Sequence, residues 1–299
     1  MYRVIVPATS ANLGPGFDCM GVALNLYNMI DVEESGDGLQ IEINGLGKEK
    51  IPINENNLIY KSMKLVFDRV GYAPKGLRII QTNEIPLTRG LGSSAACIVG
   101  GIFAANQIIG QKLTLEELEI MAAIADGHPD NTTPVIRGGL VTTVLEDDEV
   151  YHVDIEIPDN LKFAAFIPDF TLSTAKARRI LPGRISHKDA VFNAGRAALL
   201  VASLVSGKFE NLAHALEDRL HQPYRKKLIP DMDRIFEASM KNGAKGCYLS
   251  GAGPTLISIL DNHYEKFLDQ MNLYLETLST GWEIKILELN KKGVEIFVI

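Results

Sequence analysis

Cysteine is scarce in this chain of 299 residues, and the three that occur, Cys19, Cys97 and Cys247, are far apart and form no CxxC pair. Their spacing and odd number argue against a disulfide framework and against a cysteine-based zinc site. We therefore interpret them as reduced thiols of a cytoplasmic protein, and we expect Cys97 to pack in the core, where free cysteine is most often found.

An excess of positive charge and long hydrophobic runs are also missing. Thirty Lys and Arg residues against 37 Asp and Glu residues give a net charge of −7, which disfavours nucleic acid or anionic lipid as the main partner. No stretch reaches the ~18 apolar residues of a membrane helix, and the best candidate, 194–206, contains Arg196. The first residues, MYRVIVPATS, lack a basic region followed by a long apolar run. We therefore expect neither a membrane span nor a secretion signal.

The remaining composition is that of an ordinary folded protein. Hydrophobic residues make up 46% and charged residues 22% of the chain, close to the soluble average. At about 150 residues per domain, the length predicts two domains or one large one. Short β-rich runs alternate with segments of helical period, which predicts a mixed architecture of helices and strands. We place a domain boundary at the Ile-Pro-Asp-Asn turn, which gives domains at 1–157 and 158–299.

Within the first half we predict strands and two well-delimited helices. One helix begins at Asn57 and ends at Gly71, and the other begins at Thr114, where Thr114 and Glu117 form a capping box. The strand-like runs lie at 2–6, 39–43, 77–82 and 140–145, and a further one at 163–167 lies just after the predicted boundary. The second half predicts helices at 188–206, 209–221, 231–242 and 264–278, a strand pair within 246–260, and strands at 283–289 and 294–299.

The most informative segment is Pro-Leu-Thr-Arg-Gly-Leu-Gly-Ser-Ser-Ala-Ala at 86–96, a glycine-rich loop followed by an apolar helix. Glycines let a ligand approach the backbone, and the free amides of a helix N-terminus favour a polyanion such as a triphosphate. An ordinary turn with an N-cap remains the alternative. A Walker A loop is excluded because Gly207-Lys208 is followed by Phe209. The dinucleotide fingerprint is only weakly matched, and no HRD or DFG triplet occurs.

Three further segments are candidates for a ligand site. The polar, glycine-rich stretch 7–18 follows a strand and suits a loop that lines a cleft, 127–131 groups a histidine, an aspartate and an asparagine, and 250–255 is a second glycine loop. Each also has an ordinary interpretation as a turn. Arg178 and Arg225 suit a bidentate grip on a carboxylate, although either one alone is more often a solvated surface residue.

Taken in order, these segments resemble the homoserine kinases of the GHMP small-molecule kinase superfamily, over nearly the whole chain. PATSANLGPGFD is similar to the first motif of the superfamily, PLTRGLGSSAA to its phosphate loop and YLSGAGPT to its third motif. GHPDN, STAKARRILP and QPYR are similar to segments that distinguish homoserine kinases from mevalonate and galactose kinases.

The resemblance implies an α+β fold of two domains, the first like domain 2 of ribosomal protein S5 and the second ferredoxin-like, with the active site between them. It implies that ATP and L-homoserine give ADP and O-phospho-L-homoserine, a step towards threonine, with Mg²⁺ as cofactor and a homodimer as the assembly. The implied nucleotide-binding residues are Asn57, Pro86, Leu87, Thr88, Arg89, Gly90, Leu91, Gly92, Ser93, Ser94, Ala95 and Ala96. The implied homoserine-binding residues are Asn12, Asp18, His128, Asn131, Thr174, Arg178 and Arg225.

For the chemistry we expect direct in-line transfer without a covalent enzyme intermediate or a dedicated base. The arginines suit the carboxylate of the substrate, Asp18 its ammonium group, and Asn131 its attacking hydroxyl. Asn131, Ser94 and Arg178 form the implied catalytic set, and Ser94 and Asp126 the implied magnesium ligands.

One departure from the family pattern concerns magnesium. Homoserine kinases usually carry a glutamate ligand where this chain has Ile124, and isoleucine offers no oxygen. Asp126 or water would have to replace it, or activity would be reduced. DNTTP in place of the more usual DNVAP is a smaller departure. Two alternatives therefore stay open: a GHMP kinase for another small alcohol, and a nucleotide-binding regulatory homologue with little turnover.

Overall fold

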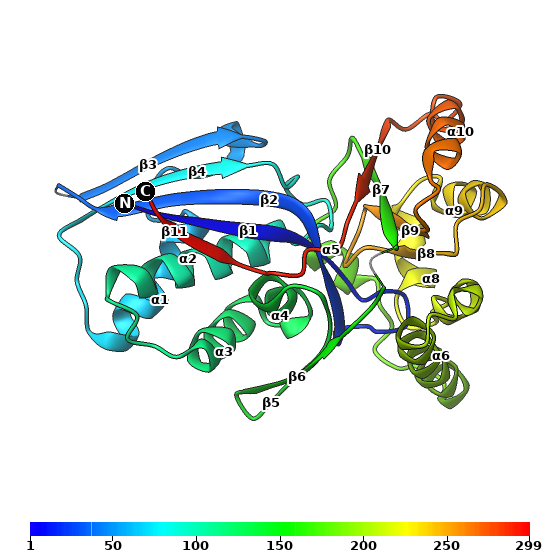
Figure 1. The fold of residues 1–299 in the computed structure, drawn as a ribbon, viewed down its shortest axis with the longest axis horizontal. Helices are drawn as coiled ribbons and strands as arrows, with labels where there is room; N and C mark the ends of the chain where they lie inside the picture. Colours follow the sequence, from blue (N-terminus) through cyan, green and yellow to red (C-terminus); the bar gives the residue numbers. More distant parts are fainter. Residues whose placement is uncertain (37, 159) are drawn as a thin grey trace.

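Two β-sheets, each flanked by helices, form the framework of the chain (Figure 1). The computed structural model describes residues 1–36, 38–158 and 160–299. Among these residues the first sheet has seven strands and the second has four. The first sheet contains β1 (Tyr2–Ala11), β2 (Met20–Glu34), β3 (Gly38–Gly45), β4 (Gly76–Asn83), β5 (Leu140–Glu146), β6 (Glu149–Ile155) and β11 (Glu295–Val298).

The first sheet runs in the order β11-β1-β2-β4-β3, and β5 and β6 extend it from the other end of β2. β2 is 15 residues long, so its first part pairs with β5 and its second part with β4. β1 pairs along β2 with a shift in register between Pro7 and Ala8. Beyond this shift β1 stays paired with the first part of β2 as far as Ala11, and it then leads into the first glycine-rich loop.

Four helices cover one face of this sheet: α1 (Leu58–Val70), α2 (Ser93–Ile108), α3 (Leu115–Asp126) and α4 (Pro129–Arg137) (Figure 1). Helix α2 is buried along most of its length. Its glycines permit this, because a Cβ at Gly100 would meet Ile30 of the sheet and a Cβ at Gly101 would meet the backbone of α1 at Ile59. The close packing fixes the N-terminus of α2 relative to both neighbours.

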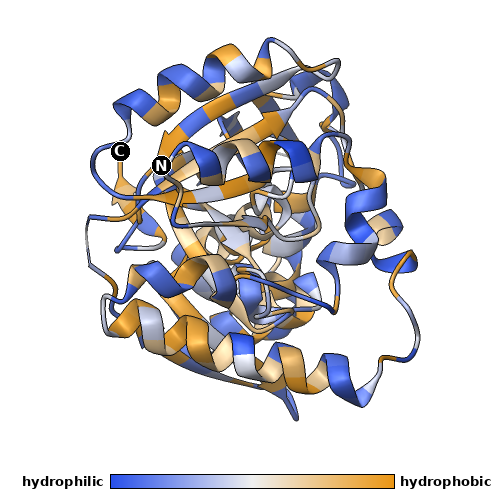
Figure 2. Ribbon diagram, turned by 90° about the vertical axis from the view of Figure 1, so that its right-hand side faces the viewer, coloured by the Kyte–Doolittle hydropathy of each residue, from blue (hydrophilic) through white to orange (hydrophobic). Residues whose placement is uncertain are grey.

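The second sheet has the order β10-β7-β9-β8 and is antiparallel throughout. With its helices it follows the strand-helix-strand-strand-helix-strand pattern of ferredoxin-like folds. In Figure 2 its helices carry alternating hydrophilic and hydrophobic residues, as helices with one buried face do. The elements of this part are β7 (Lys162–Pro168), α5 (Thr174–Arg179), α6 (His187–Val205), α7 (Leu212–Ala215), α8 (Gln222–Arg225), α9 (Met232–Lys241), β8 (Gly246–Leu249), β9 (Leu256–Leu260), α10 (Glu265–Leu275) and β10 (Trp282–Leu287), with short 3₁₀ turns at Phe209–Asn211 and Lys226–Leu228. A further 3₁₀ turn, Lys48–Lys50, follows β3 in the first part of the chain.

Several predicted elements are confirmed and others are wrong. The cap of α1 at Gly71 and the Thr114–Glu117 capping box of α3 are present. The predicted helix 209–221 is wrong, because Asp218 accepts hydrogen bonds from the backbone N–H groups of residues 220, 221 and 222 and so starts a new helix. The prediction also missed β2 and placed residues 7–11 in a loop, whereas they continue β1.

The two sheets do not divide the chain at a single point. The last strand, β11, returns to the first sheet and pairs with β1, so the two termini lie side by side (Figure 1). One hydrophobic core also runs from the first sheet to Phe163 and Tyr248 of the second. In the turn where we predict the domain boundary, Asp159 lies outside the described residues, and the boundary at 157/158 stays a prediction. No helix in the described ranges is both long and apolar enough to cross a membrane.

Candidate active site

A cavity of about 550 Å³ opens where the two parts of the chain meet. Most of the predicted site residues line this cavity, and its lining residues come from segments between residue 12 and residue 253. The predicted residues on its wall are Asn12, Asp18, Leu87, Thr88, Arg89, Gly90, Gly92, Ser93, Ser94, Ala95, Asp126, His128, Asn131, Thr174, Arg178 and Arg225. Asn57, Pro86, Leu91 and Ala96 are not among the lining residues.

The N-terminus of α2 forms one wall of the cavity. Its N-cap is Gly92, with φ 68° and no side-chain cap, and the backbone amides of residues 93–95 have no partner among the described residues. A Cβ at Gly92 would overlap the hydroxyl of Thr9. Free amides at a helix N-terminus bind anions, so this wall suits phosphate groups.

The turn between β8 and β9 is hydrogen-bonded to the phosphate loop. The Ser250 hydroxyl donates to the Gly90 carbonyl at 2.6 Å, and the Thr255 N–H donates to the Arg89 carbonyl at 3.0 Å. The Gly251 N–H donates to the carbonyl of Ala11 at the end of β1. The third glycine motif is therefore a hairpin connection, as its sequence indicates, that also holds the first two motifs together.

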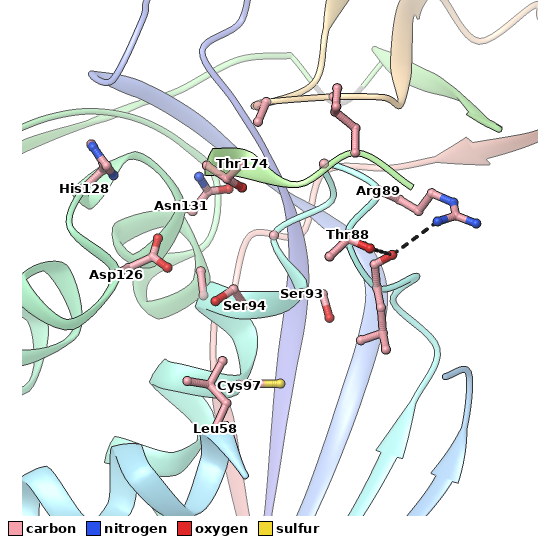
Figure 3. Close-up of a pocket in the computed structure, with 18 of the residues that line it drawn as sticks. Leu58, Thr88, Arg89, Ser93, Ser94, Cys97, Asp126, His128, Asn131 and Thr174 are labelled. Carbon is pink, nitrogen blue, oxygen red and sulfur yellow. Dashed lines mark hydrogen bonds between the residues drawn. The ribbon is translucent and has the colours of Figure 1, made fainter. Parts of the chain in front are cut away.

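Two predicted nucleotide-binding residues make hydrogen bonds that hold the wall in place, Arg89 as a lining residue and Asn57 as a residue outside the lining. Arg89 donates to the carbonyls of Pro168 and Asp169, both at 2.8 Å, so its guanidinium points away from the serines of α2 (Figure 3). Asn57 is buried, accepts hydrogen bonds from the first amides of α1, and donates to the Pro52 carbonyl at 3.0 Å. Its effect on the cavity passes through the loop before α1.

That loop adds lining residues that the sequence did not single out. Ile51, Pro52 and Leu58 join Leu87 on the wall, with Lys50 and Asn56 beside them. Apolar walls with a few polar groups are typical of pockets for planar rings. No glycine pattern or charged pair marks these residues, and only the fold shows that they face the phosphate loop.

At the other end of the cavity, charged side chains from both parts of the chain meet. Arg178 of α5 donates two hydrogen bonds to the carboxylate of Asp18, at 2.7 and 3.1 Å. Arg225 of α8 is 1% exposed and donates to the Gly251 carbonyl at 2.9 Å and the Ala177 carbonyl at 3.3 Å. The sequence analysis expects these two arginines to bind one carboxylate, and in the structure both line the same cavity.

Arg225 also contacts a residue that the sequence analysis missed. His221 is fully buried, lies 2.8 Å from the Gly14 carbonyl through Nε2, and lies 3.1 Å from Nη1 of Arg225 through Nδ1. Burial lowers the pKa of His221 to about 4, so the ring is neutral. Because the Gly14 carbonyl can only accept, Nε2 carries the proton and Nδ1 accepts from Arg225.

Asn12 and His128 line the same end. The side chain of Asn12 accepts from the Asp18 N–H at 3.0 Å and donates to the Gly251 carbonyl at 2.8 Å. Asn12 thus joins the first loop to the third. His128 precedes the first turn of α4, and burial, followed by the charge of Arg178, lowers its pKa. Thr174 begins α5 and lines the cavity together with Asn131 (Figure 3).

Carboxylates gather between these two ends. Burial raises the pKa of Asp126 to about 6. Burial, together with the charges of Asp18 and Asp126, raises that of Asp130 to about 7. Asp126 and Ser94 face each other in Figure 3, and no side chain of the described residues donates a hydrogen bond to Asp126. A carboxylate and a hydroxyl in this arrangement suit a hard cation such as magnesium, although no group of three His, Cys, Asp or Glu side chains suited to a metal occurs in the described ranges.

Ile124, which occupies the usual glutamate position, lies elsewhere. Its side chain is 51% exposed and does not line the cavity. Ile124 is therefore not one of the residues that line the cavity with Ser94 and Asp126, and the effect of this substitution on activity stays a prediction.

Two family models match the chain: the N-terminal domain of GHMP kinases over residues 57–139 and the C-terminal domain over 200–276. The homoserine kinase of Caldicellulosiruptor saccharolyticus is 54% identical, over 100% of this chain and 97% of its own length. That of Petrotoga mobilis is 49% identical, over 99% of this chain and 96% of its own. This chain belongs to the homoserine kinase family of GHMP kinases.

Solved structures agree with this assignment. The homoserine kinase of Cytophaga hutchinsonii, 30% identical, superposes with a TM-score of 0.87 over 99% of this chain and 96% of that one. The mevalonate kinase of L. major, 16% identical, superposes with a TM-score of 0.73 over 96% and 95% of the two chains, which shows a shared fold. The predicted family and the α+β, two-domain GHMP kinase fold are thereby confirmed, and membership in a kinase family implies the use of ATP.

Proposed function

We propose that this member of the family transfers the γ-phosphoryl group of ATP to the side-chain hydroxyl of L-homoserine, which gives ADP and O-phospho-L-homoserine. One observation carries the proposal. A single cavity has unpartnered helix amides at one end and the Asp18, Arg178 and Arg225 side chains at the other. The relatives described above carry the name of this activity.

The nucleotide would bind along α2. The loop from Gly90 to Ala95 would surround the triphosphate, and the amides at the start of α2 would bind its oxygens. The base would lie against Ile51, Pro52 and Leu58. Ser94 and Asp126 would hold magnesium, which neutralises phosphate charge when bound. The protein contributes fixed amides that need no reorganisation as charge moves during transfer.

The acceptor would bind at the charged end. An α-amino acid carries a carboxylate and an ammonium group on adjacent atoms, and the cavity offers guanidiniums and a carboxylate side by side. The carboxylate would pair with Arg178 and Arg225, and the ammonium group with Asp18. Asn131 would hold the attacking hydroxyl in line with the phosphoryl group. No dedicated base is assigned, since a loose transition state requires little early deprotonation.

An acceptor series tests this assignment of charges. ADP release is measured with magnesium-ATP and L-homoserine, 4-hydroxybutyrate, which lacks the ammonium group, 3-amino-1-propanol, which lacks the carboxylate, and mevalonate. We expect turnover with L-homoserine and at least a 100-fold lower kcat/KM for each analogue, about 3 kcal/mol. Equal turnover of 3-amino-1-propanol would contradict the carboxylate site, and no turnover by a chain that still binds ATP would favour a regulatory homologue.

Two further expectations stay predictions. Sedimentation velocity would check the homodimer that the family resemblance implies. Limited proteolysis near residue 158 would check the predicted boundary between the two domains.

A further inference from the structure

Thr9 connects the two ends of the cavity, although within the segment 7–18 only Asn12 and Asp18 were predicted site residues. It lies on β1, is fully buried and does not line the cavity. Its backbone N–H donates to the carbonyl of Leu91 in the phosphate loop at 3.2 Å. Its hydroxyl donates to Oδ1 of Asn131 at 2.7 Å. One residue thus contacts both the loop assigned to ATP and the side chain assigned to the acceptor hydroxyl.

The hydrogen bond from Thr9 determines which way the Asn131 amide faces. Oδ1 is occupied by Thr9, while Nδ2 donates to Oδ1 of Asp130 at 3.3 Å. An amide nitrogen carries two hydrogens, so one N–H of Asn131 remains for a ligand in the cavity. Reversing the amide would turn its oxygen towards the carboxylate of Asp130, which is unfavourable whenever Asp130 is ionised.

The position of Thr9 relative to α2 is equally constrained. The N-cap of α2, Gly92, leaves no room for a Cβ because the Thr9 hydroxyl occupies that space. The distance between the N-terminus of α2 and the amide of Asn131 is therefore set through Thr9. In-line transfer depends on that distance, since a misplacement of about 1 Å can reduce a rate by about 100-fold.

We propose that Thr9 is a positioning residue for phosphoryl transfer, which holds the Asn131 amide at a fixed place and orientation relative to the phosphate loop. The inference rests on the proposed function, because it requires an acceptor hydroxyl at Asn131. It predicts that loss of the Thr9 hydroxyl slows the transfer step and leaves the binding of both substrates nearly unchanged.

The test compares Thr9→Val, which keeps the shape and removes the hydroxyl, with Thr9→Ser, which keeps the hydroxyl. We expect Thr9→Val to lower kcat about 10- to 100-fold while KM for L-homoserine and for ATP changes less than about threefold. Thr9→Ser should stay within about threefold of the wild type in kcat. Thr143→Val is the matched control, because Thr143 is also buried on a strand and its hydroxyl contacts only that of Thr133, at 3.4 Å, among the described residues.

A double-mutant cycle separates action through Asn131 from a general structural effect. In an Asn131→Ala background, Thr9→Val should lower kcat by less than about threefold, because the partner of its hydroxyl is already gone. A full additional loss there, an effect on KM alone, or an unchanged kcat in Thr9→Val would each overturn the inference. Should Thr9→Val melt below the assay temperature, Thr9→Ala replaces it with the same expectation. No turnover of L-homoserine by the wild type would instead overturn the proposed function.

Discussion

The two ends of the cavity are built in different ways. The phosphate end consists mainly of backbone from one continuous segment, residues 90–95, held by the turn between β8 and β9. The acceptor end consists of side chains from distant segments, the charged Asp18, Arg178 and Arg225 and the neutral amide of Asn131. A site made of backbone depends on conformation, whereas a site made of side chains depends on the chemistry of each residue. Substitutions should therefore change the kinetics in different ways at the two ends.

The two ends also differ in their charges. Backbone amides contribute only partial charges, and these need no counter-ion. Beyond the phosphate end the cavity carries ionisable side chains that compensate one another only in part, since burial raises the pKa values of Asp126 and Asp130 despite the nearby Arg178. Holding these side chains in the cavity therefore lowers the stability of the folded chain.

The largest effect should come from Gly92→Ala at the phosphate end. The φ of 68° disfavours any side chain, and the new Cβ would overlap Thr9. We expect kcat/KM to fall more than about 100-fold, as the amides of α2 move. Steady-state kinetics check this, with Gly110→Ala as control. Gly110 has a φ of 79° but open space around its Cα, so its substitution should cost stability and leave the kinetics unchanged. Equal kinetic effects at both positions would show that any side chain at a glycine with positive φ lowers the activity, whether or not the glycine lies at the N-terminus of α2.

A more selective effect is expected from Arg178→Ala at the acceptor end. The variant loses two hydrogen bonds to Asp18 and the proposed fork for the substrate carboxylate. KM for L-homoserine should rise about 100-fold, corresponding to about 3 kcal/mol, while KM for ATP stays within about twofold. The control is Arg179→Ala, which removes a neighbouring exposed arginine. A parallel rise in both KM values for Arg178→Ala would mean that the two ends are not separable.

The difference between the ends explains how much of the site the sequence could predict. The phosphate loop is continuous, so its glycines, serines and following apolar helix are visible together in the sequence, and Gly90, Gly92, Ser93 and Ser94 line the cavity. Asp18, Asn131, Arg178 and Arg225 were found through resemblance to a family, because each alone has an ordinary interpretation. His221 and Thr9 were missed, since a buried histidine or threonine acquires its role only from partners far away in the sequence.

The same reasoning applies to the fold. The capping box at Thr114 and the terminal Gly71 are local signals, and both helices are confirmed. The helix predicted over 209–221 failed because the Asp218 carboxylate competes for backbone amides, which the apolar spacing does not reveal. The pairing of β11 with β1 joins residues almost 300 positions apart, and no local pattern could indicate it.

A smaller effect, measured on stability, should follow from Asp130→Asn. The pKa of Asp130 is about 7 in the folded chain, against 3.8 for a free aspartate side chain. The folded state therefore binds the proton more tightly, and it loses stability as the pH rises between these two pKa values. The neutral variant should be more stable than the wild type by about 2–4 kcal/mol at pH 8.5 and by almost nothing below pH 4. Denaturant unfolding without nucleotide at the two pH values measures this. A difference that is independent of pH would show that the charge of Asp130 is already compensated.

The smallest effect is expected from Ile124→Glu, which restores the residue usual in the family. Ile124 is 51% exposed and lies off the cavity wall, so a carboxylate there would be solvated and could not reach a cation held by Ser94 and Asp126. We expect kcat, KM for ATP and the magnesium concentration for half-maximal rate to change less than about twofold, since surface substitutions away from a site have small effects. Asp126→Asn provides the contrast, because it removes a carboxylate that faces Ser94 and should raise the magnesium requirement about 10-fold or more. The opposite outcome would be a marked increase in rate for Ile124→Glu and no decrease for Asp126→Asn. The cation would then be held at the end of α3 and not between α3 and α2. The acceptor end of the cavity would in that case extend further than the lining residues indicate.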